Sequence, residues 1–107
     1  LFSPTTFFIK KDMKISKKTI SNKFYNKYLH KIPNFKDIRG KLPEYNANRL
    51  IELFSGKKDT YRDMVIINSI YAMMIIKSKL KFNDCYEILN HSIDKGYALN
   101  HLEKLRK

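Results

Sequence analysis

The sequence contains one cysteine, and its few glycines and prolines form no linker or low-complexity segment. Cys85 is that cysteine, which excludes an internal disulfide framework and a metal site built from several cysteines of one chain. A reducing, cytoplasmic location is therefore expected. We also find no internal repeat.

The sequence has no long uninterrupted apolar run. Its most apolar stretch, Met64 to Ile76, is interrupted by Asn68 and Ser69, whereas a membrane-spanning helix needs about 20 consecutive apolar residues. We therefore expect no membrane partner. No charged-then-apolar leader opens the chain and its first residue is Leu1, so we expect a segment whose true start lies elsewhere or a trimmed chain.

Acidic residues are also scarce. The 107 residues carry 22 Lys and Arg against 10 Asp and Glu, a net charge of +12. Residues 1–40 hold 10 of the basic and 2 of the acidic side chains, which is the electrostatic pattern of a nucleic-acid binder. Another explanation is compositional: Lys, Ile and Asn make up 40 residues, as expected of an AT-rich genome, and charge runs usually form solvated faces.

The best-defined element is a helix from about 60 to 77. Thr60 and Asp63 have the spacing of a capping box at its start. The residues that follow are apolar on nearly every side, which is typical of a buried helix. Ile66, Ile67, Ile70 and Met74 are the residues that we expect to be most buried, in contact with Leu50, Phe54, Tyr86 and Leu89.

The N-terminal 40 residues predict a basic hairpin and a connector. Two β-prone runs, 5–10 and 13–20, flank Lys11-Asp12 and indicate a β-hairpin. A competing interpretation is an amphipathic helix over 17–32, because Ile20, Phe24, Tyr28 and Ile32 recur every four residues. Two prolines and Gly40 make 32–43 a connector with at most one short turn.

Two further helices are predicted in the helical part, residues 41–107. Asn46 is suited to cap a helix from about 47 to 55, which Gly56 would close. Its docking face would consist of Ala47, Leu50, Ile51 and Phe54. A third main helix contains Phe82, Cys85, Tyr86, Leu89 and Ile93 at helical spacing and ends at Gly96, after which 99–105 adds a turn or two. The predicted fold is thus an α/β fragment with a β-hairpin followed by three main helices, the middle one buried.

The order of these elements and several short motifs resemble the C-terminal third of anthranilate phosphoribosyltransferase. The upstream match, Ser3 to Thr6 and the hairpin after it, is loose, and the later match is more specific. The later residues are Asn46-Ala47, Ser55-Gly56, Arg62-Asp63, Ile67-Asn68, Ile93-Asp94, Gly96, Ala98 and Leu102 to Leu105.

The resemblance implies that 1–107 is the C-terminal part of a phosphoribosyltransferase-like α/β domain. It also implies that the family's diphosphate-binding Gly-rich loop and metal-binding Asp-Glu pair lie upstream of this chain, since no such position maps onto it. The family, a glycosyltransferase of tryptophan biosynthesis, uses Mg²⁺ with phosphoribosyl diphosphate. For this chain we predict no cofactor and no catalytic, substrate-binding or metal-binding residue. The residues singled out are structural: Asn46, Gly56, Thr60, Asp63, Ile66, Ile67, Ile70, Met74 and Gly96.

Other candidate sites have structural explanations. The loop 55–58 contains Gly and two Lys but follows a helix C-terminus, where the helix dipole disfavours anions. His30, His91 and His101 lack metal-ligand spacing. Cys85 lies on an apolar helix face, which favours a packed thiol over a nucleophile.

The function predicted is a structural part that is inactive alone, with a separately encoded N-terminal portion or self-association as possible partners. The alternative is a stand-alone basic helical module that binds nucleic acid. A binder should gather lysines 10, 11, 14, 17, 18, 23, 27 and 31 on one face, whereas an enzyme fragment should scatter them. We expect only weak, nonspecific nucleic-acid binding.

Overall fold

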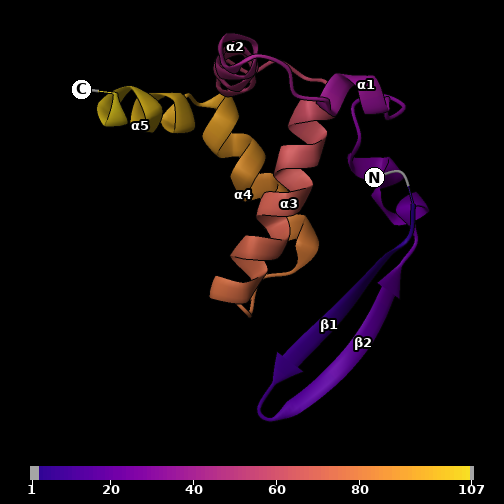
Figure 1. The fold of residues 1–107 in the computed structure, drawn as a ribbon. Helices are drawn as coiled ribbons and strands as arrows, with labels where there is room; N and C mark the ends of the chain where they lie inside the picture. The colour runs from indigo at the N-terminus through magenta and orange to yellow at the C-terminus, as the bar shows by residue number, and fades with distance from the viewer. Residues whose placement is uncertain (1–2, 107) are drawn as a thin grey trace.

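A two-stranded hairpin projects from a body of helices in the computed structural model of this chain (Figure 1). The structure describes residues 3–106, and the expectation about Leu1 lies outside them. Strand β1, Thr5–Lys11, pairs antiparallel with β2, Lys14–Ile20. Asp12 and Met13 both have positive φ, 50° and 70°, as in the type I′ turns that match the twist of two-residue hairpins. The predicted hairpin is confirmed.

The competing helix over 17–32 is wrong, because β2 occupies its first part and a 3₁₀ helix, η1, covers only Asn22–Tyr28. Ser21 begins η1 by accepting a hydrogen bond from the backbone N–H of Lys23. Three residues per turn place Tyr25 and Tyr28 on one side, and these two rings are buried. Phe24 and Ile32, two positions of the four-residue pattern, are exposed.

The helical body contains two short helices before the central one. Helix α1 is one turn, Phe35–Ile38, and α2 spans Pro43–Phe54. The predicted start of α2 was wrong: Leu42 is its N-cap and Pro43 its first residue, because proline's fixed φ suits the first helical position. Asn46 is therefore inside α2, where its side chain accepts from the backbone N–H of Lys41 and donates to the carbonyl of Lys41.

The earlier start also corrects the docking face of α2. Leu53 is its buried residue, although the sequence pattern favoured Ala47 and Ile51, both of which are exposed. Leu50 and Phe54 pack against the core as expected. The C-terminus follows prediction: Gly56 has a φ of 102°, and Gly56 and Lys57 donate to the carbonyls of Leu53 and Glu52, the Schellman pattern of a left-handed glycine.

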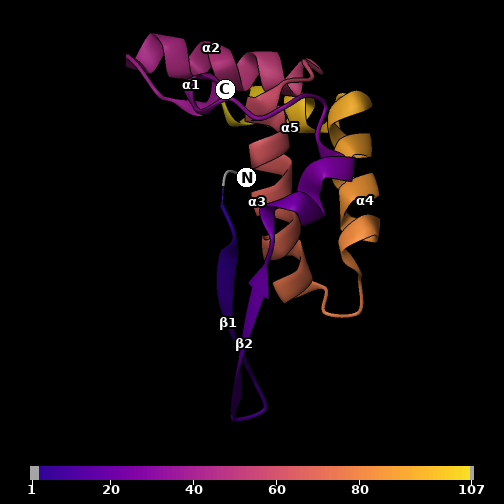
Figure 2. The same ribbon diagram turned by 90° about the vertical axis from the view of Figure 1, so that its right-hand side faces the viewer.

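Helix α3, Thr60–Ile76, runs through the middle of the body, and α4, Phe82–Asp94, packs beside it (Figure 2). Gly96, with φ of 77°, separates α4 from α5, Tyr97–Leu105. The helix α2 crosses the end of the α3–α4 pair. No described helix meets the length and hydropathy needed to cross a bilayer.

The core lies where α2, α3 and α4 meet. Its buried residues are Leu53, Ile66, Ile70, Cys85 and Ile93, and Leu50, Phe54, Tyr86 and Leu89 pack around them. Ile66, Ile67 and Ile70 are buried as predicted, with Ile70 0% exposed. Met74 is only half-buried, which corrects that expectation, because the last turn of α3 extends past its cover and leaves Ile75 and Ile76 exposed.

An aromatic cluster attaches the N-terminal segment to this core. Phe82 of α4 lies against the rings of Phe24, Tyr25, Tyr28 and Tyr71, with centroid distances of 4.7 to 6.0 Å. The hydroxyls of Tyr25 and Tyr71 are 2.7 Å apart. Such ring pairs contribute about 0.5–1.5 kcal/mol each beyond burial, so η1 is held firmly against α3 and α4.

Candidate functional site

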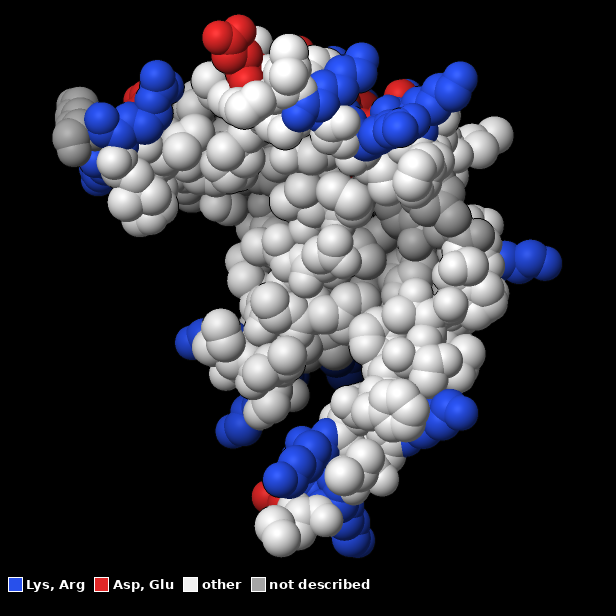
Figure 3. Space-filling model, viewed as in Figure 1, with Lys and Arg blue, Asp and Glu red and all other residues white. Residues whose placement is uncertain are grey.

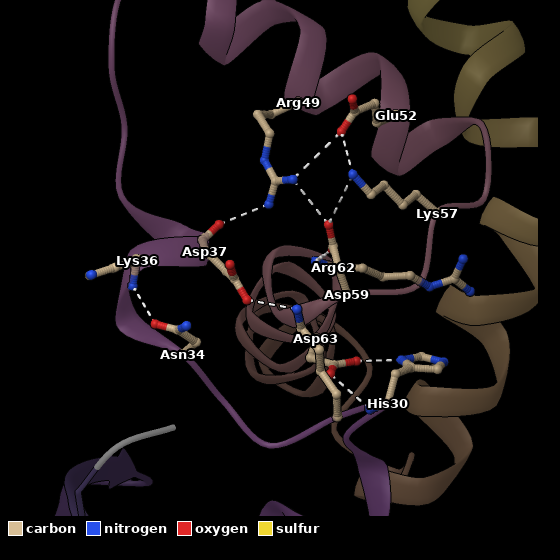
Figure 4. A network of polar contacts seen from close by, with 11 residues as sticks. His30, Asn34, Lys36, Asp37, Arg49, Glu52, Lys57, Asp59, Arg62 and Asp63 are labelled. Atoms are coloured by element: carbon tan, nitrogen blue, oxygen red, sulfur yellow. Dashed lines mark hydrogen bonds and ion pairs between the residues drawn. The ribbon is translucent and has the colours of Figure 1, made fainter.

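The largest group of polar side chains surrounds the first turn of α3, and we call it the α3 polar cluster (Figure 4). It draws on the segment after η1, on α1, on α2 and on α4. Its members are His30, Asp37, Arg49, Asp59, Arg62, Asp63, Asn90 and Asp94. The pairing of these side chains decides what the cluster can do.

Asp59 is the N-cap of α3. It accepts from the backbone N–H of Arg62 at 2.9 Å, and its second oxygen accepts from Arg49 at 3.1 Å. The predicted capping box of Thr60 and Asp63 is therefore wrong, since the cap lies one residue earlier and Thr60 is already helical. An N-cap carboxylate satisfies an end N–H and complements the helix dipole.

Arg49 links α2 to this cap. Besides Asp59 it donates to the carbonyl of Asp37 at 2.8 Å, and its guanidinium lies 4.9 Å from the ring centre of Tyr61. The carboxylate of Asp37 lies 2.8 Å from Nζ of Lys31, and a hydrogen bond from that lysine lowers the pKa of Asp37. Arg49 thus connects α1, α2 and α3, because its guanidinium donates to acceptors of this chain.

Arg62 is the most buried charged side chain of the cluster, 0% exposed. It donates to Oδ1 of Asn90 at 2.7 Å, to Oδ1 of Asp94 at 2.9 Å and to the carbonyl of Gly56 at 3.2 Å. A buried guanidinium is tolerated when such acceptors replace water. Arg62 therefore fastens the α2–α3 loop and α4 to the start of α3.

Asp63 holds the segment that follows η1. One oxygen accepts from the backbone N–H of His30 at 2.8 Å, and the other lies 2.5 Å from His30 Nδ1. Because a carboxylate only accepts, the Nδ1 atom carries the proton in this contact. The side chain of Asp63 is 2% exposed, so its role is to tie two distant segments together rather than to cap its own helix.

A shallow pocket of about 180 Å³ adjoins the cluster. Its lining comes from α1, the residues that follow it, α2 and α3, and consists of Asp37, Ile38, Arg39, Gly40, Tyr45, Asn46, Arg49 and Tyr61. Ligand pockets for small molecules usually have about 300–1,000 Å³. Within residues 3–106, no group of three or more His, Cys, Asp and Glu side chains is placed to hold a metal ion. The contacts of Arg49 and Arg62 hold α1, α2, α3 and α4 together.

The remaining candidate groups lie apart from one another. His30 contacts Asp63, whereas His91 on α4 lies edge-on to Tyr97, and His101 is on α5. Cys85 is 0% exposed, and burial raises the pKa of its thiol, as expected of a packed cysteine. The loop after α2 is a C-cap, as predicted.

The five lysines of the hairpin do not lie on one of its faces. Register pairs Phe7 with Lys18 and Phe8 with Lys17, so the five hairpin lysines divide between its two faces. Figure 3 shows blue side chains along the upper rim, at both side edges and on the hairpin, around a white central region. Tyr25 and Tyr28 are aromatic rings close in sequence to lysines, where exposed rings could stack on bases, but both are buried.

The fold and the cluster define a class: an α/β fragment with a protruding hairpin, held together by a polar network. No protein-family model matches the chain. No solved structure matches it either.

Curated relatives identify the protein that the fragment resembles. The chain is 33% identical over 69 residues to anthranilate phosphoribosyltransferase of Methanococcoides burtonii. It is 35% identical over 69 residues to the Bacillus cereus enzyme and 29% over 68 residues to that of Aquifex aeolicus. Each match covers 64% of this chain and 20% of the relative. The resemblance inferred from the sequence is confirmed, and the chain spans about a fifth of the relatives' length.

Proposed function

We propose that this chain is a C-terminal structural part of an anthranilate phosphoribosyltransferase-like protein and is inactive alone. The observation that carries the proposal is the match to several relatives over one fifth of their length. Under this proposal the chain belongs to tryptophan biosynthesis in the cytoplasm. It contributes covering helices and a hairpin to a domain whose other residues bind the substrates.

The chemistry of the reaction supports inactivity. Displacing pyrophosphate from a ribose carbon needs a metal ion and preorganised donors that neutralise the developing charge. The resemblance assigns the diphosphate loop and metal carboxylates to upstream segments. In the α3 polar cluster, Arg49 and Arg62 donate to acceptors of this chain, so their charge is committed to holding helices together.

The test is product formation from anthranilate, phosphoribosyl diphosphate and Mg²⁺. The assay is run with the chain alone and with the chain mixed with an N-terminal portion of a relative. Turnover only on mixing supports the proposal, and turnover by the chain alone would overturn it.

A nucleic-acid-binding module stays the alternative. The charge of +12 favours it, whereas the division of the hairpin lysines between two faces and the burial of Tyr25 and Tyr28 favour an enzyme fragment. A DNA titration at several salt concentrations separates the two functions.

A further inference from the structure

The hairpin has one face that contacts the helical body and one whose large apolar side chains are exposed. Phe7 packs against Tyr71 with centroids 4.6 Å apart. Side chains alternate across a strand, so the neighbours of Phe7 point away from the body. We call this side the hairpin outer face; by register it comprises Thr6, Phe8, Lys10, Ile15, Lys17 and Thr19.

The hairpin outer face has an apolar centre. Phe8 and Ile15 are each 72% exposed, and their cross-strand partners, Lys17 and Lys10, place them as diagonal neighbours. Large apolar side chains gathered on a projecting element mark an interaction surface more often than scattered ones do. On the same face, nearer the base of the hairpin, the hydroxyls of Thr6 and Thr19 lie 3.1 Å apart.

Each strand of the hairpin also has one edge that pairs with no other strand among the described residues. The sheet among residues 3–106 contains β1 and β2 alone, so each strand has one edge without a neighbouring strand. Isolated two-stranded hairpins are marginal in water, and three or more strands or packing against a helix are needed for independent stability. The outer half of this hairpin meets neither condition within the described structure (Figures 1 and 2).

Charge decides which occupant fits. The charged residues of the hairpin outer face are Lys10 and Lys17, and the hairpin with its turn carries five lysines against one aspartate. A second copy of this chain would therefore bring like charges together. Edge lysines are a known device against self-pairing of strands. A chain that presents apolar side chains rimmed by carboxylates would be attracted instead.

We propose that the hairpin outer face is the docking surface for the complementary, N-terminal portion of an anthranilate phosphoribosyltransferase-like protein, which packs an acid-rimmed apolar surface on Phe8 and Ile15. This inference rests on the proposed function, because about four fifths of each relative lies outside the segment that matches this chain. The partner's packing would cover the apolar side chains that residues 3–106 leave exposed on the hairpin outer face.

The experiment measures binding of the 107-residue chain to a partner of known identity. The probe is the Methanococcoides burtonii enzyme truncated to remove the fifth of its length that matches this chain. If the truncated enzyme unfolds cooperatively, it is purified alone. If it does not, it is co-expressed with the chain. The test variant is Phe8→Glu with Ile15→Glu. The matched control is Ile32→Glu, which changes a 90% exposed residue outside the hairpin in the same way.

We expect the wild type and Ile32→Glu to bind the probe with equal affinity, and the double variant to bind it roughly tenfold or more weakly. Equal binding by all three would overturn the docking surface and leave the proposed function standing. A wild-type chain that does not bind the folded or co-expressed probe would also overturn it, while turnover by the chain alone is the separate result that removes the proposed function. Dimerisation or DNA binding that only the double variant loses, with the probe still bound, would assign the surface to a second copy or to nucleic acid and would equally contradict the inference.

Discussion

Nδ1 of His30 lies 2.5 Å from Oδ1 of Asp63, and this contact joins the segment after η1 to the first turn of α3. The backbone N–H of His30 donates to the other oxygen. Local spacing assigns Asp63 to the cap of α3, but its side chain binds His30, 33 residues away in the sequence.

Asp63→Ala should destabilise the chain by roughly 1–3 kcal/mol, because it removes both acceptors and leaves the His30 N–H without its partner. Denaturant unfolding monitored by circular dichroism measures the loss. A double-mutant cycle with His30→Ala isolates the ring contact. Strictly additive losses would show that the ring contact contributes nothing, whereas the structure predicts favourable coupling.

Ile70→Ala should cost roughly 2–5 kcal/mol, since the side chain is 0% exposed and lies in the centre of the core. The matched control is Ile75→Ala on the same helix, where the side chain is 83% exposed. It should change stability by about 0.5 kcal/mol or less. Thermal melts of equal midpoint for the two variants would mean that α3 is not the core of the fold.

Asp59→Ala should destabilise by roughly 0.5–2 kcal/mol through loss of the cap of α3. Asp59→Asn should retain most of the capping contribution, because asparagine caps about as well as aspartate, and the remaining loss reports the pair with Arg49. Thr60→Val keeps the side-chain shape and should cost less than Asp59→Ala. The reverse order in urea unfolding would restore the cap to Thr60.

Nucleic-acid binding should be weak and nonspecific. With five lysines divided between the two faces of the hairpin, affinity for duplex and single-stranded DNA should fall steeply as salt is raised, because it depends on counterion release. Fluorescence anisotropy at several salt concentrations measures this. Sequence-selective binding that survives about 150 mM salt would favour the nucleic-acid-binding module.

Elements with strong local signals could be predicted from the sequence. The hairpin, α3 and α4 follow from β-prone runs and apolar periodicity, and Gly56 and Gly96 end helices in the left-handed conformation as expected. Helix starts were less predictable, because neighbouring residues compete for the same cap. Helix α2 begins at Pro43, before the predicted cap Asn46, and α3 is capped by Asp59 instead of Thr60.

The α3 polar cluster was not predictable, because its contacts join residues far apart in the chain. Arg62 reaches Asn90 and Asp94, 28 and 32 positions later, and no local pattern indicates these pairs. The one available signal was the resemblance, which singled out Arg62-Asp63 and Ile93-Asp94 without giving their contacts. Burial of Arg62 follows only once α3 and α4 are packed together.

The most direct test of the central claim is phosphoribosyl transfer to anthranilate. The 107-residue chain is assayed with phosphoribosyl diphosphate and Mg²⁺, first alone and then mixed with the truncated relative. Loss of a single preorganised oxyanion donor lowers a rate by about 10²–10³, and the resemblance places the whole set upstream of this chain. The account therefore predicts no product from the chain alone and product on mixing, whereas turnover by the chain alone would contradict it.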